Sequence, residues 1–411
     1  MSSMQPRLSR RALFGLAGAG AVAAGVGGVG VARAVSDASA SDTVAFYGEH
    51  QAGIATAQQT HVLFSAFDVV TRDVGALTAL LQGWTQLAAA LTQGEPVGDG
   101  GAFGGLPTAP PEDNGEAELL STANLTITVG FGRTLFVRDD ADRFGLESQL
   151  PDELQPIPSL PFDALDAARS DGDIALQVCA DDPQVAMHAM RVLKREAIGV
   201  CTQRWTQSGF LSRPTDGSTP RNLFGFKDGT ANVRTPTELN EHVWADGAPE
   251  WMNGGSYLVA RRIAMTIEVW DRTSLVEQET IVGRRKGTGA PLSGGAEFTD
   301  PNFEHTASDG QRSIAKVAHV RLAHPSRHDG RRMLRRGFNY EDGVDQLGRW
   351  DAGLFFLAYS KDPRSHVIPA MTDLARHDVM NEYIRHTASA AFAMPPGVQG
   401  SDDWWGRALF T

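Results

Sequence analysis

The sequence contains only two cysteines, Cys179 and Cys201, among its 411 residues. Two thiols are too few for a cysteine-rich zinc site, an iron–sulfur cluster or a covalent CxxCH attachment. A disulfide between them remains an alternative in an oxidising compartment. Two separate buried thiols are the favoured interpretation.

The chain also lacks an excess of positive charge. It carries 37 Lys and Arg against 49 Asp and Glu, a formal charge of −12. Nucleic-acid binding is therefore disfavoured, because phosphate contacts require basic patches. The remaining composition, 42% hydrophobic and 21% charged, is that of a globular protein with enough apolar material for a large core. The length is typical of two domains or one large one.

The N-terminal segment has the pattern of an export signal. Arg10 and Arg11 precede a run rich in Ala, Gly and Val, and Ala32-Arg33-Ala34 supplies the small residues of a cleavage site. This pattern predicts a twin-arginine signal peptide over residues 1–40 and a periplasmic, extracellular or cell-envelope location. An uncleaved membrane anchor is the alternative, but the run is too rich in glycine to favour it. Twin-arginine cargo is exported folded and often carries a cofactor.

The first half of the mature chain alternates predicted strands and helices. Helical periodicity places Leu77, Leu80, Leu81, Trp84 and Leu87 on one face. Pro183 falls in the first turn of the second helix, where its missing N–H is harmless. The predicted strands are 61–70, 124–132 and 173–180, the helices are 73–91 and 182–196, and 93–117 is a loop rich in Gly and Pro.

The second half repeats this order. The predicted strands are 256–270, 315–322, 352–360 and 389–395, and the predicted helices are 271–284 and 362–377, with a Gly-rich loop over 285–312. The segments "ALQVCADDPQVAMHAM" and "FFLAYSKDPRSHVIPAM" also match locally, so that Asp182 corresponds to Asp362 and Pro183 to Pro363. The repeat predicts an α+β fold of two duplicated ferredoxin-like domains, 41–215 and 216–411. Antiparallel sheets with outer helices would leave an apolar pocket between the sheets, suited to a flat cofactor.

Three short segments of the second half carry candidate functional residues. "GFKDGT" (225–230) holds Asp228 between glycines, which indicates either a surface turn or a backbone that passes close to a bulky group. "AHVRLAHP" (318–325) places His319 in a predicted strand, where a lone histidine is commonly structural. "MLRRGFNY" (333–340) pairs Arg335 with Arg336, either as a solvated turn or to bind acidic groups such as propionates.

Taken together, these segments resemble the dye-decolourising (DyP-type) haem peroxidases, and more closely their exported branch, which includes a deferrochelatase of bacterial iron uptake. The resemblance spans about residues 44–397. The matching segments are "FYGEHQAGI" (46–54), "LTITVGFG" (125–132), "GDIALQVCADD" (172–182), "NLFGFKDGTAN" (222–232), "AHVRLAHP" and "MLRRGFNY".

The resemblance implies one non-covalent haem b per chain, with His319 as the proximal iron ligand. It implies that Asp228 is the distal acid–base residue and Arg335 the distal arginine, Arg336 being the weaker candidate. The residues that it implies line the haem are Gly229, Thr230, Ala231, His319, His324, Pro325, Ser326 and Arg335.

One position departs from the family pattern. His324 stands where the family commonly has Asn, so two histidines compete as iron ligands, and the strand context favours His319. Asp362 is a candidate acceptor for the other nitrogen of His319, although its counterpart Asp182 suggests that it is a helix cap instead.

The implied function is a peroxidase that uses hydrogen peroxide to oxidise dyes and phenolic donors. A carboxylate over the metal can take a proton from peroxide and return it, and an Asp, with a reference pKa of about 3.9, stays a usable base in acid. Activity is therefore expected to be highest at roughly pH 3.5–5.5. Arg335 would stabilise the departing oxygen.

Two other functions remain open. A deferrochelatase would remove iron from haem and leave the porphyrin intact, and a haem carrier would leave Asp228 and Arg335 unexplained. The expected small-molecule partners are peroxide with small aromatic reductants, or haem as substrate; iron-permease components and a homodimer are further expectations. Bulky dyes would need a surface electron relay, for which the candidates are Trp205, Trp244, Trp251, Trp270, Trp350 and Tyr340.

Overall fold

A computed structural model describes residues 42–247 and 249–411. The predicted signal peptide, 1–40, lies outside the described residues. Residues Thr43–Thr411 form one compact unit. Cys179 and Cys201 are both buried in it as free thiols, which confirms the favoured interpretation of the two cysteines.

The N-terminal half forms a four-stranded antiparallel sheet with the strand order β4-β1-β3-β2, the order of a ferredoxin-like unit. The predicted strands and helices are confirmed with small shifts at their ends. The elements are β1 (His61–Val69), α2 (Val74–Gln93), β2 (Thr126–Gly132), α3 (Arg133–Phe136), η1 (Glu147–Gln149), η2 (Ala167–Arg169), β3 (Ile174–Ala180), α4 (Pro183–Glu196) and β4 (Cys201–Phe210).

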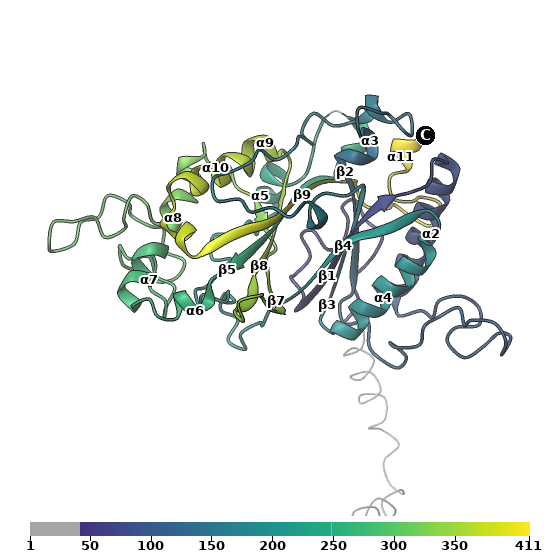
Figure 1. Cartoon of the computed structure of the whole chain (residues 1–411), viewed down its shortest axis with the longest axis horizontal. Coiled ribbons are helices and arrows are strands. Elements are labelled where there is room, and N and C mark those ends of the chain that lie inside the picture. The colour runs from purple at the N-terminus through teal and green to yellow at the C-terminus, as the bar shows by residue number, and fades with distance from the viewer. Residues whose placement is uncertain (1–41, 248) are drawn as a thin grey trace, which may run out of the picture. The chain divides into compact units, whose positions relative to one another are not determined.

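Helices α2 and α4 lie side by side on the outer face of this sheet (Figure 1). The Asp73 side chain caps α2, and the helix ends at Gly94 in the left-handed conformation. Trp84 is fully buried and its Nε1 donates to the Leu193 carbonyl of α4 at 2.8 Å. By length and composition α2 is also apolar enough to cross a membrane, but its apolar side is packed into the core of the sheet.

The C-terminal half repeats the strand order as β7-β8-β5-β9. The short β6 pairs with β8 on the same edge as β7, because β5 occupies the other edge. The elements are α5 (Pro236–His242), η3 (Glu250–Met252), β5 (Ser256–Met265), α6 (Ile267–Trp270), α7 (Leu275–Val282), α8 (His319–Leu322), η4 (Pro325–Arg327), β6 (Leu334–Arg335), β7 (Phe338–Val344), β8 (Trp350–Ser360), α9 (Pro363–His366), α10 (Ile368–His377), η5 (Val379–Glu382), β9 (Ile384–Met394) and α11 (Arg407–Phe410).

The prediction of a strand over 315–322 is wrong. This segment contains the short helix α8, and the strand position beside β8 is taken by β6 and β7 instead. The alternation of apolar residues in "AKVAHVRL" carries no information about a pairing partner, and a strand needs one. The real strand β7 was missed because Glu341, Asp342 and Gly343 give its second half the composition of a turn.

One predicted strand and two predicted helices of this half also differ from the structure in their bounds. The strand predicted over 256–270 stops at Met265, and the helix predicted from 271 begins at Leu275, after Ser274 caps it. The helix predicted over 362–377 is divided at Val367 into α9 and α10. Pro369 follows that division, and it cannot donate a backbone hydrogen bond to the preceding turn.

The two sheets join along both edges. Phe131 pairs with Ala393 at the β2–β9 edge, and Phe210 pairs with Asn339 at the β4–β7 edge. The inner faces are packed against each other by a cluster of aromatic and aliphatic side chains that includes Phe64, Phe355 and Phe392. Eight strands therefore form a continuous closed array around a filled core.

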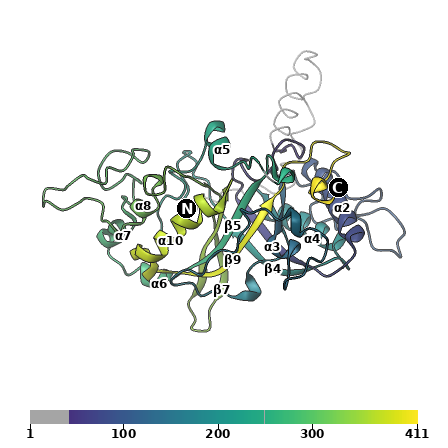
Figure 2. The ribbon, with the colours of Figure 1, turned by 90° about the horizontal axis from the view of Figure 1, so that it is seen from above.

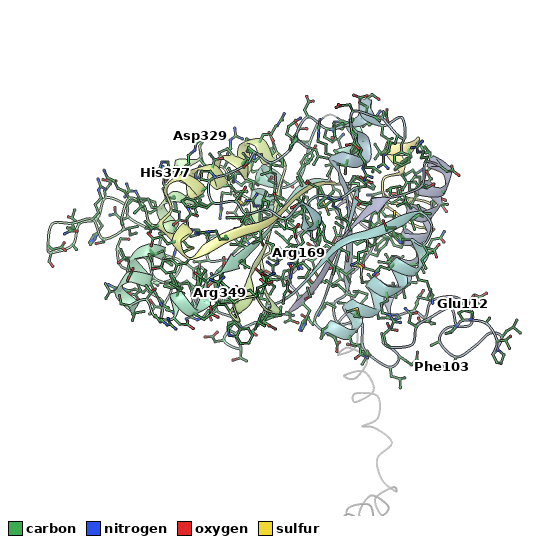
Figure 3. The ribbon with its side chains drawn as sticks, in the orientation of Figure 1. Phe103, Glu112, Arg169, Asp329, Arg349 and His377 are labelled. Carbon is green, nitrogen blue, oxygen red and sulfur yellow. The ribbon has the colours of Figure 1, made fainter. Side chains whose placement is uncertain are left out.

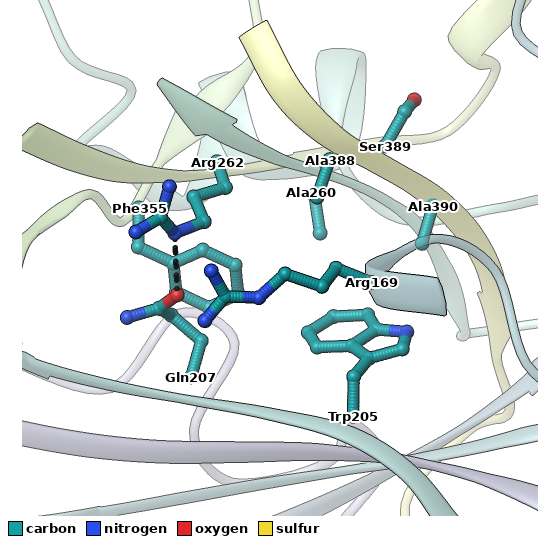
Figure 4. A pocket seen from close by; sticks show the side chains of 9 residues that line it. All are labelled: Arg169, Trp205, Gln207, Ala260, Arg262, Phe355, Ala388, Ser389 and Ala390. Carbon is teal, nitrogen blue, oxygen red and sulfur yellow. Dashed lines mark hydrogen bonds between the residues drawn. The ribbon is translucent and has the colours of Figure 1, made fainter. Parts of the chain in front are cut away.

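Side chains leave little room between the two sheets. A cavity of only about 10 Å³ lies there, and Figure 4 shows the side chains that line it, Trp205, Arg262 and Phe355 among them. Arg262 Nε donates to Gln207 Oε1 at 3.0 Å. The expectation of a cofactor pocket between the sheets is therefore wrong. A larger pocket is lined by Asp228 and Arg335 instead.

Helices cover the outer faces of both sheets. Helix α10 packs on the outer face of β5 and β8 through Met371 and Ala375. Figure 2 places α6, α7, α8 and α10 at the end of the unit away from α2 and α4. In Figure 3, Asp329 and His377 mark this helical end, while Phe103 and Glu112 mark the loop between α2 and β2.

Candidate active site

Asp228 lies in the loop between β4 and α5, which aromatic packing fixes to the protein. Phe224 and Phe226 are buried on Trp270, with the Phe224 and Trp270 rings stacked at 4.2 Å. Trp270 Nε1 also donates to the Phe224 carbonyl at 3.0 Å. Contacts of both its side chains and its backbone with Trp270 therefore hold the loop in place, although it contains no regular helix or strand.

The two glycines beside Asp228 are required by the backbone. Gly225 has φ +80°, and a Cβ there would come within 2.6 Å of Lys286 Cε. Gly229 has φ +119°, a conformation that side-chain-bearing residues rarely adopt. The Asp228 N–H is bonded to the Pro220 carbonyl at 2.8 Å, so the carboxylate is held at a defined place above the loop.

Asp228 and Arg335 form an ion pair. Arg335 Nη1 donates to Asp228 Oδ1 at 2.7 Å, while Oδ2 has only a 3.4 Å contact from Asn222 Nδ2. Arg335 follows Leu334, which packs in the core between the sheets, so alternation along β6 directs Arg335 to the outer face. Both side chains are partly exposed to a pocket.

Arg336 has a different role. It is buried, and its Nη1 donates to the Thr56 carbonyl at 2.6 Å while Nη2 is bonded to Gln59. These contacts attach the segment before β1 to the end of β6. Of the adjacent arginines, Arg335 is thus the one that reaches Asp228.

Asn232 was not singled out from the sequence, although it lies four residues after Asp228 in the same loop. Its Nδ2 donates to the Arg335 carbonyl at 2.7 Å, and its Oδ1 accepts from the Arg335 N–H at 2.8 Å. One side chain therefore satisfies both backbone groups of Arg335 and fixes β6 to the Asp228 loop. An Asn in a polar run after a glycine turn looks like ordinary loop composition, which explains why it was missed.

Glu297 was also missed, because it lies in the Gly-rich loop. Its carboxylate is bonded to Lys227, next to Asp228, and accepts from Thr230 Oγ1 at 3.2 Å. Burial raises the pKa of Glu297, but hydrogen bonds from Lys227 and Thr219 outweigh burial and hold the pKa below its usual range. The 285–312 loop is thereby fastened to the Asp228 loop by a charged contact.

His319 is the first residue of α8, and its ring is held by a buried carboxylate. His319 Nδ1 lies 2.6 Å from Asp378 Oδ2, and Asp378 follows the last turn of α10. Because an ionised carboxylate can only accept, Nδ1 is the donor, and in the neutral imidazole Nε2 therefore keeps its lone pair. The hypothesis that Asp362 fills this role is wrong, since Asp362 caps α9 and pairs with Arg364.

His319 combines a raised pKa with a partly accessible side chain. Burial lowers the pKa of His319, but the charge of Asp378 and the hydrogen bond to it outweigh burial and raise the pKa above its ordinary value. Yet 36% of its side-chain surface is accessible. The charges of Asp228 and Arg335 also act on the imidazole, Asp228 raising the pKa of His319 and Arg335 lowering it.

Within residues 42–247 and 249–411, the second histidine, His324, makes no hydrogen bond or ion pair with a carboxylate. Its Nδ1 accepts from the Ser326 N–H at 3.2 Å and so caps the turn that Pro325 begins, and its ring contacts Phe303 edge-on. Burial lowers the pKa of His324. The loop residues Gly229, Thr230 and Ala231 follow Asp228 directly, and their carbonyls accept from Arg234 and Arg332.

The side chains of this candidate site fit a haem iron better than a metal ion without a porphyrin. Among residues 42–247 and 249–411, no three His, Cys, Asp or Glu side chains gather as metal ligands. A lone imidazole with a free Nε2 suits a metal whose other ligands come with a porphyrin. Arg284 is bonded only to the carbonyls of Gly289 and Glu297 within the described part of the chain, so its charge is available to a propionate.

The candidate electron-relay residues are mostly interior. Of the six aromatic residues named from the sequence, Trp350 is the one that is exposed, at 55% of its surface. Trp205 stacks on Phe64, Trp244 on His50 and Trp270 on Phe224, each as part of the packing. No relay residue is assigned.

Comparison with known proteins gives one consistent result. The model of the family described as Dyp-type peroxidase, N-terminal, matches residues 51–211, and that of Dyp-type peroxidase, C-terminal, matches residues 219–399. The deferrochelatase of Escherichia coli K12 is 38% identical over 425 aligned positions, covering 98% of this chain and 96% of the relative.

Solved structures agree. The oxyferrous complex of DtpA from Streptomyces lividans superposes with a TM-score of 0.83 at 37% identity, covering 90% of this chain and 98% of that one. A DyP-type peroxidase from Cellulomonas bogoriensis gives 0.80 at 37% identity, with 90% and 98% covered. With both family models and the duplicated fold matched, this chain belongs to the Dyp-type peroxidase family.

Proposed function

We propose that this chain is a haem b peroxidase in which His319 binds the iron, and Asp228 and Arg335 act on hydrogen peroxide. One observation supports this proposal: Asp228 and Arg335 form an ion pair, and the charges of both act on the pKa of a histidine that a buried carboxylate holds. Family membership supports it. The neighbour DtpA is described in ferric and oxyferrous states, so that protein contains iron.

Each side chain has a defined task. Asp378 orients His319 and increases the electron donation of its Nε2, as carboxylates do behind metal-bound histidines. Arg284 offers its unneutralised charge to a haem propionate. When bound, haem supplies the redox-active iron and the porphyrin that accept oxidising equivalents from peroxide.

The distal pair handles the proton and the charge. Asp228 Oδ2 is the less engaged oxygen of its carboxylate, so it can take a proton from peroxide and return it to the departing oxygen. The guanidinium of Arg335 would stabilise negative charge as the O–O bond breaks. The short contact to Arg335 also keeps Asp228 aimed into the pocket.

The test is reconstitution of the purified chain with haem, followed by rapid mixing with peroxide. A Soret band that responds to peroxide, and catalytic oxidation of a phenol, are expected. A chain that takes up haem but reacts with peroxide no faster than free haem would contradict the proposal.

A second candidate function is supported by the curated relatives. Those at 38–39% identity that cover 98% of this chain are named deferrochelatase. Iron release from bound haem without peroxide, with a metal-free porphyrin recovered by its fluorescence, would establish that activity. Loss of iron only together with porphyrin breakdown would exclude it.

Export by the twin-arginine pathway is also proposed, on the basis of Arg10, Arg11 and the Ala32-Arg33-Ala34 pattern. A double Arg10→Lys, Arg11→Lys variant should stay inside the cell, and an exported variant would contradict the proposal. Iron-permease components as partners and a homodimeric state rest on the family resemblance alone. Co-purification with the permease and light scattering would test them.

A further inference from the structure

The segment between α7 and α8 has an unusual anchor. We call residues 285–312 the strap; it contains no helix and no extended strand, and it extends from the helical end of the unit (Figure 1). Among residues 292–312, all of which the structure describes, Glu297 is the one buried residue. Phe298 beside it is 61% exposed. A carboxylate, and not an apolar side chain, therefore holds this part of the strap to the protein.

Glu297 binds the loop that carries Asp228. Its carboxylate pairs with Lys227, and the side chains of Lys227 and Glu297 are only 12% and 10% accessible. Gly289, also on the strap, packs against this ion pair: a Cβ there would come within 2.8 Å of Lys227 Cδ and 3.2 Å of Glu297 Cγ. The ion pair is therefore enclosed by the strap itself.

The strap also contacts the segment that carries His319. Arg321 of α8 donates from Nη1 to the Phe303 carbonyl at 2.7 Å, and the Phe303 ring lies edge-on to His324 at 5.0 Å. The strap thus connects the Asp228 loop with α8, whose first residue is His319. In the proposed function, these two segments supply the residues that bind the iron and act on peroxide.

Arg284, just before the strap, joins it to the proposed ligand. Its Nη1 donates to the carbonyls of Gly289 and Glu297, each at 2.8 Å. The same guanidinium is the one available to a haem propionate. Bound haem and the closed strap would therefore share one side chain, and opening the strap would remove the contacts that orient it.

The ion pair is the main restraint on opening the strap. A segment with few buried apolar contacts opens at a low cost in free energy. Removing Glu297 would leave the buried ammonium of Lys227 without a counter-charge, and opening would return that charge to water. The strap should therefore stay closed while the pair is intact and open readily when the pair is broken.

We propose that the strap is a lid over the proposed haem site and that the Lys227–Glu297 ion pair is its latch, which sets the rate at which haem or free porphyrin enters and leaves. The inference rests on the proposed haem site. It bears on both candidate functions, because a peroxidase must retain its haem, whereas a deferrochelatase must release a metal-free porphyrin.

The first test measures haem transfer from the haem-loaded full chain to excess apomyoglobin. Glu297→Gln should speed transfer about tenfold, because it removes a hydrogen bond between charged groups, while the Soret band before transfer is unchanged. Asp309→Asn is the matched control: it removes one negative charge from the same strap, where Asp309 accepts from the Gln311 N–H at 2.9 Å. Equal transfer rates for Glu297→Gln and Asp309→Asn would overturn the proposal.

A double-mutant cycle tests whether the pair acts as one unit. Lys227→Met should speed transfer about as much as Glu297→Gln, and the double variant should be no faster than either single variant. Effects that multiply in the double variant would show that the two side chains act independently, and would overturn the latch.

Hydrogen–deuterium exchange of the full chain before haem is added tests the latch without any ligand. Peptides from residues 285–312 should exchange faster in Glu297→Gln, while those from α4 should not, which would show that the variant is folded. Unchanged exchange in the strap would overturn the latch. A wild-type chain that takes up no haem would overturn both the proposed function and the lid, whereas normal haem uptake with unchanged transfer would overturn the lid alone.

Discussion

The two halves share one strand order but differ in what covers the outer face of each sheet. In the N-terminal half, the connection from β1 to β2 contains the 20-residue helix α2, which packs with α4 into a continuous core. In the C-terminal half, the corresponding connection from β5 to β7 contains the short helices α6, α7 and α8, the turn η4 and the two-residue strand β6, together with long loops.

This difference creates the site. The outer face of the C-terminal sheet carries two small clusters in place of one large core. One cluster holds the aromatic residues that anchor the Asp228 loop, and the other packs α10, after which Asp378 lies. A duplicated fold can thus hold a ligand by dividing one helix into short pieces, without opening the core between its sheets.

The largest expected effect is on haem binding. His319→Ala should remove the iron ligand and weaken haem binding by at least about 100-fold, so that the purified protein lacks a Soret band. His324→Ala is the matched control and should keep its haem. If His324→Ala loses haem and His319→Ala keeps it, His324 is the iron ligand.

The next effect concerns the distal pair. Asp228→Asn should keep haem but slow the reaction with peroxide by about 10²–10⁴-fold, the usual contribution of a positioned acid–base group. Arg335→Leu should slow it by about 10²–10³-fold through lost charge stabilisation. Stopped-flow spectroscopy measures both rates. If the Asp228→Asn variant reacts with peroxide faster than the Arg335→Leu variant, the arginine contributes more than the aspartate to this reaction.

A substitution in the N-terminal half should affect stability alone. Trp84→Ala would leave a large cavity under α2 and lower the free energy of unfolding by about 3–5 kcal/mol. Denaturant unfolding measures the loss. The peroxide rate of the folded fraction should be unchanged, and a changed rate would show that the two halves are coupled.

A smaller effect is expected from Asn232→Ala. This change leaves both backbone groups of Arg335 without their partner, so the guanidinium should be less well placed beside Asp228. The peroxide rate should fall about tenfold, equivalent to roughly 1.4 kcal/mol, with haem content unchanged. Rescue by Asn232→Asp is not expected, because a carboxylate cannot donate to the Arg335 carbonyl.

The last effect, which is absent at neutral pH, is an acid sensitivity located in the C-terminal half. Burial and the nearby Arg261 lower the pKa of His386 to about 3. Between about pH 6.5 and 4.5 the unfolded chain therefore binds a proton that the folded chain does not, and stability falls as the pH falls by about 1.4 kcal/mol per unit. His386→Asn should reduce this slope in chemical unfolding, and an unchanged slope would assign the protons elsewhere.

The sequence predicted the architecture well where one local signal was sufficient. Asp182 and Pro183 began α4 as expected, and the match of "DPQ" with "DPR" showed the duplication. It predicted Asp228 and Arg335 as a pair through family resemblance. It did not predict α8, β7 or Asp378, because each depends on a contact between segments far apart in the chain.

By itself, the sequence determined the strands and helices predicted for the N-terminal half and the special backbone around Asp228, since glycine turns and hydrophobic periodicity act over a few residues. Only the tertiary structure decided which carboxylate supports His319, 59 residues away. The position of the site on the outer face of the C-terminal sheet was also decided only by the tertiary structure. Side-chain packing between distant segments decides these points, and no local pattern encodes it.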